Sequence, residues 1–281
     1  MAKLLEGKPV AEKIKLEIKR QVKLLRQPPV LASLLVGDNA GAASYVRSQA
    51  KTAEELGIVY KLFELSKDTT ESSLIDFILK LNADKSVNGI IVQMPLPGHI
   101  DYSKINESIL PLKDVEGLHP ENTGKLFLSR RGFASCTARA VMELINSTGV
   151  DLYGKEAVVV GHSEIAGKPL AFLLLDRFAT ITVCHIATSK AGKLEEHVKR
   201  AEVLIVAVGK AGLIKGGWVR EGSIVIDVGI NRVDGKIVGD VEFEQAQKRA
   251  SFITPVPGGV GPLTVTMLMR NLTEAAKLQQ Q

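Results

Sequence analysis

The chain has 281 residues, of which 45% are hydrophobic and 24% are charged, and its formal net charge is +5. This ordinary composition predicts a soluble globular chain with a sizeable core, and the length suggests about two domains. No stretch approaches the ~18 consecutive apolar residues of a membrane span, and the N-terminus does not have the pattern of a signal peptide.

The modest positive charge is compatible with an acidic small substrate. It does not point to nucleic acid, because the lysines form no basic block and no aromatic residues are interleaved with them. Cys136 and Cys184 are the only cysteines and lack metal-binding spacing, which predicts free thiols in a reducing cytosol. We therefore expect a cytoplasmic protein without a metal and without a nucleic-acid or membrane partner.

Strands and helices are expected to alternate through the first half of the chain. An amphipathic helix is predicted from about Pro9 to Leu25, where apolar residues recur every four positions. After it we expect a buried strand at 30–36, a helix at 42–56 ending at Gly57, a strand at 58–65, a helix at 69–81 and a buried strand at 89–94. This alternation favours a parallel α/β sheet.

The second half begins with an expected loop at 111–124 and a bridging helix at 137–147. Four strands are then predicted, at 157–160, 180–184, 203–208 and 223–228, and 252–253 leads into a turn. A last helix at 263–277 is expected to pack back on the first domain. That domain would then be discontinuous, formed by residues 1–139 and 263–281, with residues 140–262 as the second domain.

The segment 157–172, AVVVGHSEIAGKPLAF, carries a candidate phosphate site. A β-branched run leads into Gly161, and Gly167 and Pro169 fit the first turn of a helix. A strand, tight turn and helix N-terminus suit a pyrophosphate, because the N-terminus presents N–H groups and partial positive charge. Ser163 stands at the second glycine position of the usual G-x-G-x-x-G pattern, so a plain crossover without a ligand is the alternative.

Five polar side chains are candidates for binding or catalysis. Tyr45 and Gln49 are four residues apart and share a helix face, and Gln93 ends a buried strand where an amide could meet a heterocycle edge. Asp114 and Glu116 follow in the next loop and could accept from an amino-substituted ring. The alternatives are a tyrosine covering the sheet edge and, for each acid, a loop charge or turn cap.

The run at 255–262, PVPGGVGP, is unusually rich in turn residues. Three glycines and three prolines in eight residues predict a rigid, shaped wall against a ligand, in which backbone N–H groups approach something flat or anionic. A turn between domains is the simpler alternative.

Together these segments resemble the bifunctional methylenetetrahydrofolate dehydrogenase/cyclohydrolase family, and the resemblance covers almost the whole chain. The matching motifs are Tyr45 with 53–57 (AEELG), 92–97 (VQMPLP), 113–115 (KDV) with His119-Pro120, Cys136-Thr137, 161–163 (GHS) with 167–169 (GKP), 227–231 (DVGIN), 239–241 (GDV) and 254–264. The last of these is highly specific.

The resemblance implies an α/β fold of two domains around a cleft, the first binding folate and the second a Rossmann-like, doubly wound NAD(P)-binding sheet, in a homodimer. It implies NADP-dependent oxidation of methylenetetrahydrofolate and hydrolysis of the methenyl product. Tyr45, Gln49, Gln93 and Asp114 would be the catalytic residues, and the substrate would also meet Glu116, Pro257, Gly258 and Gly259. The dinucleotide would be held by Gly161, His162, Ser163, Ile186, Ile230 and Thr137.

Several positions depart from the family pattern. Gln49 stands where the family usually has lysine, and Glu116 where it usually has aspartate. His162 and Ile186 replace a frequent arginine and serine, which weakens the expected contacts to a 2′-phosphate. Around the Cys-Thr turn, the usual prolines and glycine are replaced by Ser135, Ala138 and Ala140.

These departures lead to the hypothesis that dehydrogenase activity persists and cyclohydrolase activity is weak or absent. Hydride transfer is mainly a matter of positioning, whereas hydrolysis needs a proton carrier, and the Gln49 amide can only form hydrogen bonds. Two alternatives stay open: an NAD-dependent enzyme of the same family, and a folate-binding paralogue with little turnover.

Overall fold

The computed structural model describes residues 1–38 and 40–280, which form two α/β units and confirm the predicted fold class. The six-stranded unit comprises residues 1–12 and 135–264, and the three-stranded unit comprises residues 13–134 and the segment from 265 onward. The expected boundary differs at the N-terminus, because β1 (Lys3–Leu4) pairs in parallel with β11 (Phe252–Ile253) and joins the larger sheet. Both units are therefore discontinuous in sequence.

The six-stranded sheet is entirely parallel and has the order β1-β11-β8-β7-β5-β6. Its central strands are β5 (Glu156–Val160), β7 (Val203–Val206) and β8 (Ile224–Asp227), and β6 (Thr180–Cys184) lies at one edge. After β5 the chain adds β6 on one side and then returns to add β7 on the other. The carboxyl ends of β5 and β7 thus form a topological switch point, where α/β sheets bind ligands.

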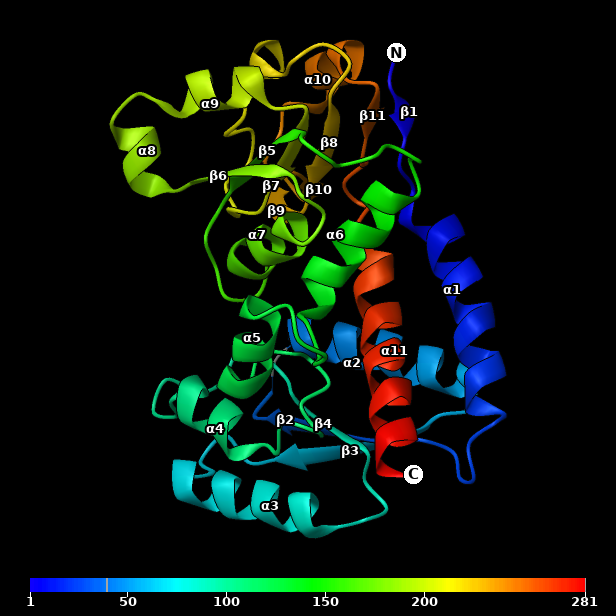
Figure 1. Ribbon diagram of the computed structural model, residues 1–281. Helices are drawn as coiled ribbons and strands as arrows, with labels where there is room; N and C mark the ends of the chain where they lie inside the picture. The colour runs from blue at the N-terminus through cyan, green and yellow to red at the C-terminus, as the bar shows by residue number, and fades with distance from the viewer. Residues whose placement is uncertain (39, 281) are drawn as a thin grey trace. The chain divides into compact units, whose positions relative to one another are not determined.

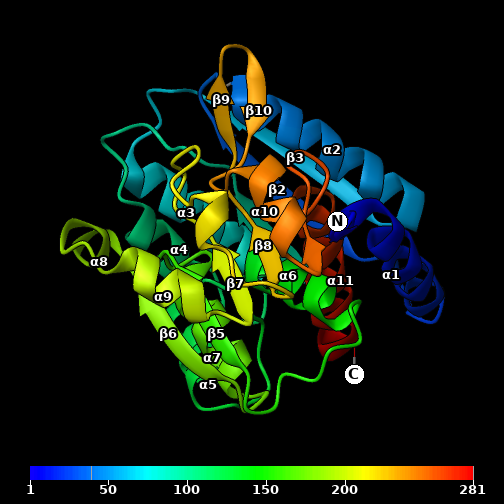
Figure 2. The same cartoon turned by 90° about the horizontal axis from the view of Figure 1, so that it is seen from above.

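Helices cover both faces of this sheet (Figures 1 and 2). One face packs against α6 (Cys136–Asn146) and α7 (Gly167–Leu175). The other face forms a core of valines, leucines and isoleucines with α9 (Leu194–Arg200), the short helix η1 (Gly216–Trp218) and α10 (Phe243–Arg249). Burial on both faces explains why the central strands β5, β7 and β8 are almost uninterrupted apolar runs.

The three-stranded unit is a smaller parallel sheet of order β3-β2-β4. Its elements are α1 (Gly7–Val22, shared at its start with the other unit), β2 (Val30–Val36), α2 (Ala40–Leu56), β3 (Val59–Leu65), α3 (Glu71–Ala83), β4 (Gly89–Val92) and α11 (Gly261–Gln279). The expected return of the last helix to this sheet is seen in the bonds from Asn271 Nδ2 to the carbonyls of Val115 and Ala134, at 2.8 and 3.2 Å.

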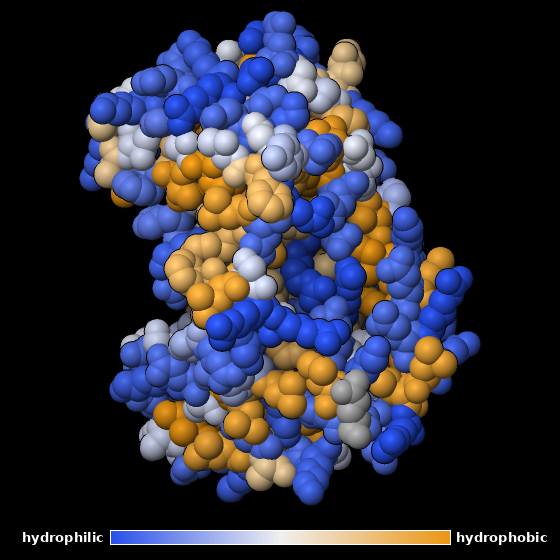
Figure 3. All heavy atoms as spheres, viewed as in Figure 1, coloured by the Kyte–Doolittle hydropathy of each residue, from blue (hydrophilic) through white to orange (hydrophobic). Residues whose placement is uncertain are grey.

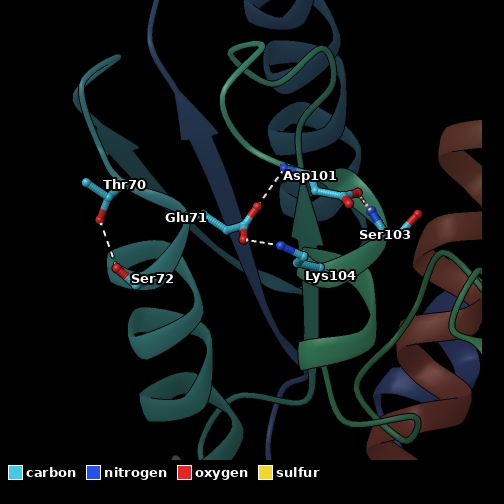
Figure 4. Close-up of polar contacts among 6 residues, drawn as sticks. All are labelled: Thr70, Glu71, Ser72, Asp101, Ser103 and Lys104. Atoms are coloured by element: carbon cyan, nitrogen blue, oxygen red, sulfur yellow. Dashed lines mark hydrogen bonds and ion pairs between the residues drawn. The ribbon is translucent and has the colours of Figure 1, made fainter.

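One face of this sheet packs against α3 and α4 (Tyr102–Ser108). Thr70 caps the N-terminus of α3, and Glu71 joins the two helices by accepting from Asp101 N at 2.9 Å and Lys104 Nζ at 2.8 Å (Figure 4). This pairing lowers the pKa of the Glu71 carboxyl. The opposite face carries Ser33, and Leu272 of α11 lies close to Gly89 on that side.

Several elements were not predicted from the sequence. They are α4, α5 (Pro120–Phe127), α8 (Ile186–Lys190), α9, α10 and a hairpin of β9 (Asn231–Val233) and β10 (Lys236–Val238). The prediction of a loop at 111–124 is wrong in its last part, because His119 accepts from Glu121 N and Pro120 opens α5. Proline is favoured in that first turn because its missing N–H is not needed there.

None of the helices in the described residues is long and apolar enough to cross a membrane. Hydrophilic side chains dominate the face shown in Figure 3, with smaller apolar patches between them. No group of three or more histidine, cysteine, aspartate or glutamate residues within 1–38 and 40–280 is arranged to hold a metal ion.

Candidate active site

The turn after β5 is shaped by two glycines that allow unusually close backbone packing. Gly161 has a φ of 121°, and a Cβ at this position would overlap the carbonyl of Ala207. A Cβ on Gly167 would in turn overlap the carbonyl of Gly161. The N-terminus of α7 is thereby held against the end of β5, and no side chain caps that helix at Ala166. This is the geometry in which a helix start receives an anion.

A pocket of about 270 Å³ opens at the switch point of the six-stranded sheet. Four of the predicted cofactor residues lie in its wall: Gly161, His162, Ser163 and Ile186. The opposite side is the turn after β7, with Ala207, Val208 and Lys210. The other two predicted cofactor residues do not line this pocket. Thr137 lies in the first turn of α6, and Ile230 is exposed in the loop after β8.

Asp240 holds the turn that forms the far wall of this pocket. It is fully buried, and its Oδ2 accepts from Val208 N at 2.7 Å and Gly209 N at 2.9 Å. Its Oδ1 accepts from Lys210 N and Asn231 Nδ2, both at 2.8 Å. One carboxylate thus satisfies four donors, which fixes the position of the pocket wall.

Asp227, at the end of β8, shapes the loop beside it. Its Oδ1 accepts from Gly229 N and Asp240 N at 2.9 and 3.0 Å, and its Oδ2 accepts from Val241 N at 2.9 Å. Burial raises the pKa of Asp227 to about 6, against the opposing effect of these hydrogen bonds. In the sequence, Asp227 and Asp240 were noted only as parts of family motifs, and no role was predicted for either. The available signal was an acid directly after a buried strand, with a second acid after Gly239.

Replacing Gly161 with alanine is expected to abolish close packing of this turn and to weaken dinucleotide binding at least tenfold. The added Cβ meets backbone atoms of Ala207, which have no freedom to move away, and φ is in the region that favours glycine. Titration calorimetry with NADP measures the effect. Gly149→Ala is the matched control, because Gly149 also has a positive φ, of 73°, but no atom lies within 4 Å of the place that the added methyl group would occupy. An equal loss of NADP affinity in both variants would contradict the argument.

In the three-stranded unit, the structure brings Gln49 and Gln93 together. Gln93 Nε2 donates to Gln49 Oε1 and to Ser33 Oγ, both at 2.9 Å, and all three residues are buried. Gln93 follows β4, and its backbone N–H donates to Leu34 O at 2.8 Å. The two amides therefore meet at the switch point of this smaller sheet, between the carboxyl ends of β2 and β4. Tyr45 lies one turn earlier on α2 and is partly exposed.

Gln49, Gln93, Ser33 and Tyr60 form one hydrogen-bonded group, which we call the amide cluster. The sequence did not predict that Tyr60 belongs to it. Its hydroxyl donates to Gln49 Oε1 at 2.9 Å, and burial raises the pKa of the phenol to about 12. Gln49 Oε1 therefore has two donors, whereas Gln49 Nε2 is buried and has no hydrogen-bond partner within the described residues. A buried donor without a partner costs about 1–3 kcal/mol, so this nitrogen is a natural place for a ligand acceptor.

The two acids of the next loop differ in their surroundings. Asp114 is buried and caps its own loop, accepting from Gly117 N, His119 N and Asn122 Nδ2 at 3.0, 2.8 and 2.9 Å. Glu116 is partly exposed by surface area, but the protein crowds its carboxyl group. Desolvation, with a smaller contribution from the negative charge of Asp114, raises the pKa of Glu116 to about 8. At neutral pH the Glu116 carboxyl thus carries its proton.

Glu116→Gln is expected to stabilise the protein at pH 9 by on the order of 1–3 kcal/mol and to change little at pH 4.5. Because the folded pKa is raised from 4.5 to about 8, wild-type stability falls as pH rises between these values. Glutamine mimics the protonated acid and removes that loss. Urea unfolding at both pH values measures it, with Glu107→Gln on the exposed side of α4 as control. A gain that is the same at both pH values would count against a raised Glu116 pKa.

Lys113 lies beside Asp114 but cannot serve as a proton carrier. Its ammonium donates to the carbonyls of Leu81, Asn82 and Asp84 at 2.8, 2.8 and 2.7 Å, which uses all three protons. The side chain is buried, and desolvation lowers the pKa of Lys113. Lys113 therefore caps the end of α3, and no lysine takes part in the hydrogen bonds described above for the amide cluster.

The run 255–259 forms a tightly packed turn in the six-stranded unit. Gly259 N donates to Pro255 O at 2.8 Å, and Gly258 has a φ of 113°. Gly7, at the start of α1, donates to Gly258 O at 2.8 Å, and a Cβ on Gly7 would overlap the carbonyl of Gly259. Packing against α1 therefore accounts for part of the glycine content. The wall that Pro257, Gly258 and Gly259 are expected to present to the substrate stays a prediction.

A doubly wound sheet, a glycine turn at its switch point and an adjoining pocket define the six-stranded unit as a dinucleotide-binding fold. Residues 135–280 match the NAD(P)-binding domain of the tetrahydrofolate dehydrogenase/cyclohydrolase family, and residues 5–116 match its catalytic domain. The chain belongs to this enzyme family, as the sequence motifs predicted.

Known relatives cover the whole length of the chain. Bifunctional protein FolD from Halothermothrix orenii is 50% identical over 282 residues, which make up 99% of each protein. The crystal structure of the bifunctional FolD methylenetetrahydrofolate dehydrogenase/cyclohydrolase from Campylobacter jejuni has a TM-score of 0.96 at 46% identity and 99% coverage of both chains. The Trypanosoma brucei enzyme, complexed with NADP and an inhibitor, has a TM-score of 0.93 at 38% identity, covering 99% of this chain and 98% of that one.

Proposed function

We propose that this chain oxidises 5,10-methylenetetrahydrofolate to 5,10-methenyltetrahydrofolate with NADP, and that it hydrolyses the methenyl product weakly or not at all. The observation that carries the second half is the amide cluster. Gln49 occupies the buried position beside Gln93 with a group that holds hydrogen bonds but does not exchange protons at neutral pH.

The residues at the switch point fit a dinucleotide. Gly161 and Gly167 leave no room for side chains between the end of β5 and the start of α7, so a pyrophosphate can approach backbone N–H groups there. The nicotinamide ring supplies the hydride acceptor when it is bound, and the chain's part is to orient it and to exclude water. Ser163, Ile186, Ile230 and Thr137 are proposed as further contacts to the cofactor.

The folate substrate is proposed to bind the three-stranded unit. Tyr45 offers an aromatic face for stacking, and Gln49 Nε2 offers a donor that the protein leaves unpaired. Gln93 fixes the Gln49 amide, and Glu116, protonated at neutral pH, can donate to a ring nitrogen or carbonyl. Asp114 already accepts three hydrogen bonds, so its main part is to hold the loop that carries Glu116.

Two assays on the purified protein separate the half-reactions. The first follows formation of the methenyl product from methylenetetrahydrofolate and NADP, and the second follows decay of added methenyltetrahydrofolate without a dinucleotide. We expect turnover in the first and decay close to the spontaneous rate in the second. Folate binding without any dinucleotide-dependent turnover would instead support a folate-binding paralogue, and homodimer formation stays a prediction for sedimentation analysis.

A further inference from the structure

The amide cluster joins buried and half-buried polar groups from four elements of the three-stranded unit. Ser33 comes from β2, Tyr60 from β3 and Gln49 from α2, and Gln93 directly follows β4. Side chains alternate along a strand, and Tyr60 is paired with Leu31 in the ladder, so Tyr60 and Ser33 point to the same face of the sheet. Each strand, or its end, therefore supplies one polar group to the surroundings of the Gln49 amide.

The hydrogen bonds of this cluster run in a defined direction. Gln93 Nε2 uses both of its protons, one on Gln49 Oε1 and one on Ser33 Oγ, each at 2.9 Å. The Tyr60 hydroxyl donates to Gln49 Oε1 at 2.9 Å and is hydrogen-bonded to the Ser33 hydroxyl on its other side. Burial raises the pKa of the Tyr60 phenol to about 12, against the opposing effect of Ser33, so Tyr60 keeps its proton and stays a donor at neutral pH.

These bonds determine which way round the Gln49 amide lies. Its oxygen receives two donors, whereas its nitrogen has no partner within the described residues, although the side chain is fully buried. Turning this amide alone would set its NH₂ group against two other donors. The amide could turn only if Gln93, Ser33 and Tyr60 reversed their bonds together with it. The cluster therefore holds the two N–H protons of Gln49 toward an acceptor from outside the protein.

We infer that Tyr60 is a positioning residue for the folate substrate, and that it acts by holding the Gln49 amide with its N–H protons toward the ligand. This inference rests on the proposed folate site in the three-stranded unit. It assigns an acceptor of the substrate, a carbonyl oxygen or a ring nitrogen, to the amide nitrogen of Gln49. Tyr60 needs no contact with the ligand, because its hydroxyl is bonded to Gln49 on one side and to Ser33 on the other.

Tyr60→Phe tests this role, because it removes the hydroxyl and keeps the ring. Gln49 Oε1 then has a single donor, the amide is free to turn, and the ligand has to order it on binding. We expect the affinity for tetrahydrofolate, measured by titration calorimetry, to fall about fivefold to tenfold, as for the loss of one hydrogen bond. The affinity for NADP should stay at the wild-type level, because no residue of the amide cluster lines the pocket of the six-stranded unit.

A double-mutant cycle with Gln49→Met separates positioning from simple packing. The Gln49→Met protein has no amide to hold, so adding Tyr60→Phe to it should change the tetrahydrofolate affinity less than about twofold, which is within the additivity expected of uncoupled sites. Tyr153→Phe is the control for loss of a tyrosine hydroxyl, since Tyr153 lies in the six-stranded unit with its ring centroid 5.7 Å from that of Phe178. It should bind tetrahydrofolate as the wild type does.

Ser33→Ala is a second variant that does not depend on how well Tyr60→Phe folds. It removes the hydroxyl that links Gln93 to Tyr60, and its loss of affinity should likewise vanish in the Gln49→Met protein. Equal tetrahydrofolate affinity in the wild type and Tyr60→Phe, or a loss that persists without the Gln49 amide, would overturn the inference. A wild-type protein that does not bind tetrahydrofolate at all would overturn the proposed folate site as well.

Discussion

Gln49→Lys is expected to raise methenyltetrahydrofolate hydrolysis at least tenfold above the wild-type rate, because a positioned acid or base contributes about 10²–10⁴-fold. The new ammonium would lie beside Gln93 and the Tyr60 hydroxyl in a buried site. Burial disfavours the charged form of a lysine and lowers its pKa toward neutrality, which suits proton transfer. Loss of the methenyl absorbance, corrected for the spontaneous reaction, measures the gain.

Two controls accompany this variant. Gln49→Met keeps the length of the side chain but carries no proton, so its hydrolysis rate should stay at the wild-type level. Lys51→Gln removes the lysine two residues after Gln49 and should have no effect, since Lys51 is exposed. Wild-type hydrolysis that is well above the spontaneous rate, and that Gln49→Lys leaves unchanged, would refute the hypothesis of a missing proton carrier.

Asp240→Asn is expected to weaken NADP binding at least tenfold and to lower the free energy of unfolding by about 3 kcal/mol. The carboxylate accepts four hydrogen bonds from Val208, Gly209, Lys210 and Asn231. An asparagine offers one acceptor oxygen, and its NH₂ group would face N–H donors. Calorimetry with NADP and urea unfolding measure the two effects.

The matched control is Asp234→Asn, in the turn between β9 and β10. Asp234 is exposed and has a φ of 49°, a conformation that asparagine adopts readily. We expect wild-type binding and stability from it. An Asp240→Asn variant that binds NADP normally would show that the turn at 208–210 holds its position without the carboxylate.

The parts of the site that depend on local patterns were predictable from the sequence. Gly161, Gly167 and Pro169 belong to one short segment whose strand, turn and helix are each visible in residue type. The meeting of Gln49 and Gln93 could be expected only in outline, from their places on a helix face and at a strand end. Their direct bond follows from the pairing of β2 with β4, which the periodicity of either segment does not reveal.

The residues that sequence reasoning missed act across longer separations. Asp240 bonds to a turn 30–32 residues before it, and Tyr60 reaches Gln49 from the neighbouring strand. A single acid or tyrosine has many possible partners, and only the sheet order selects among them. The helix at 120–127 was different, because its local signals were present in His119, Pro120 and Glu121 and were outweighed by the polar composition of the segment.

Each unit is built from two segments that lie far apart in the sequence, and this affects how the chain can fold while it is being synthesised. The three-stranded unit needs α11, whose Asn271 bonds to Val115 and Ala134 and whose Leu272 lies close to Gly89. The six-stranded unit needs β11, to which the N-terminal β1 is joined. Neither unit can be completed before the residues after 250 have been synthesised, so the apolar surface that β11 and α11 cover stays exposed until late in translation. A nascent chain of this kind is a natural client for chaperones that bind before release.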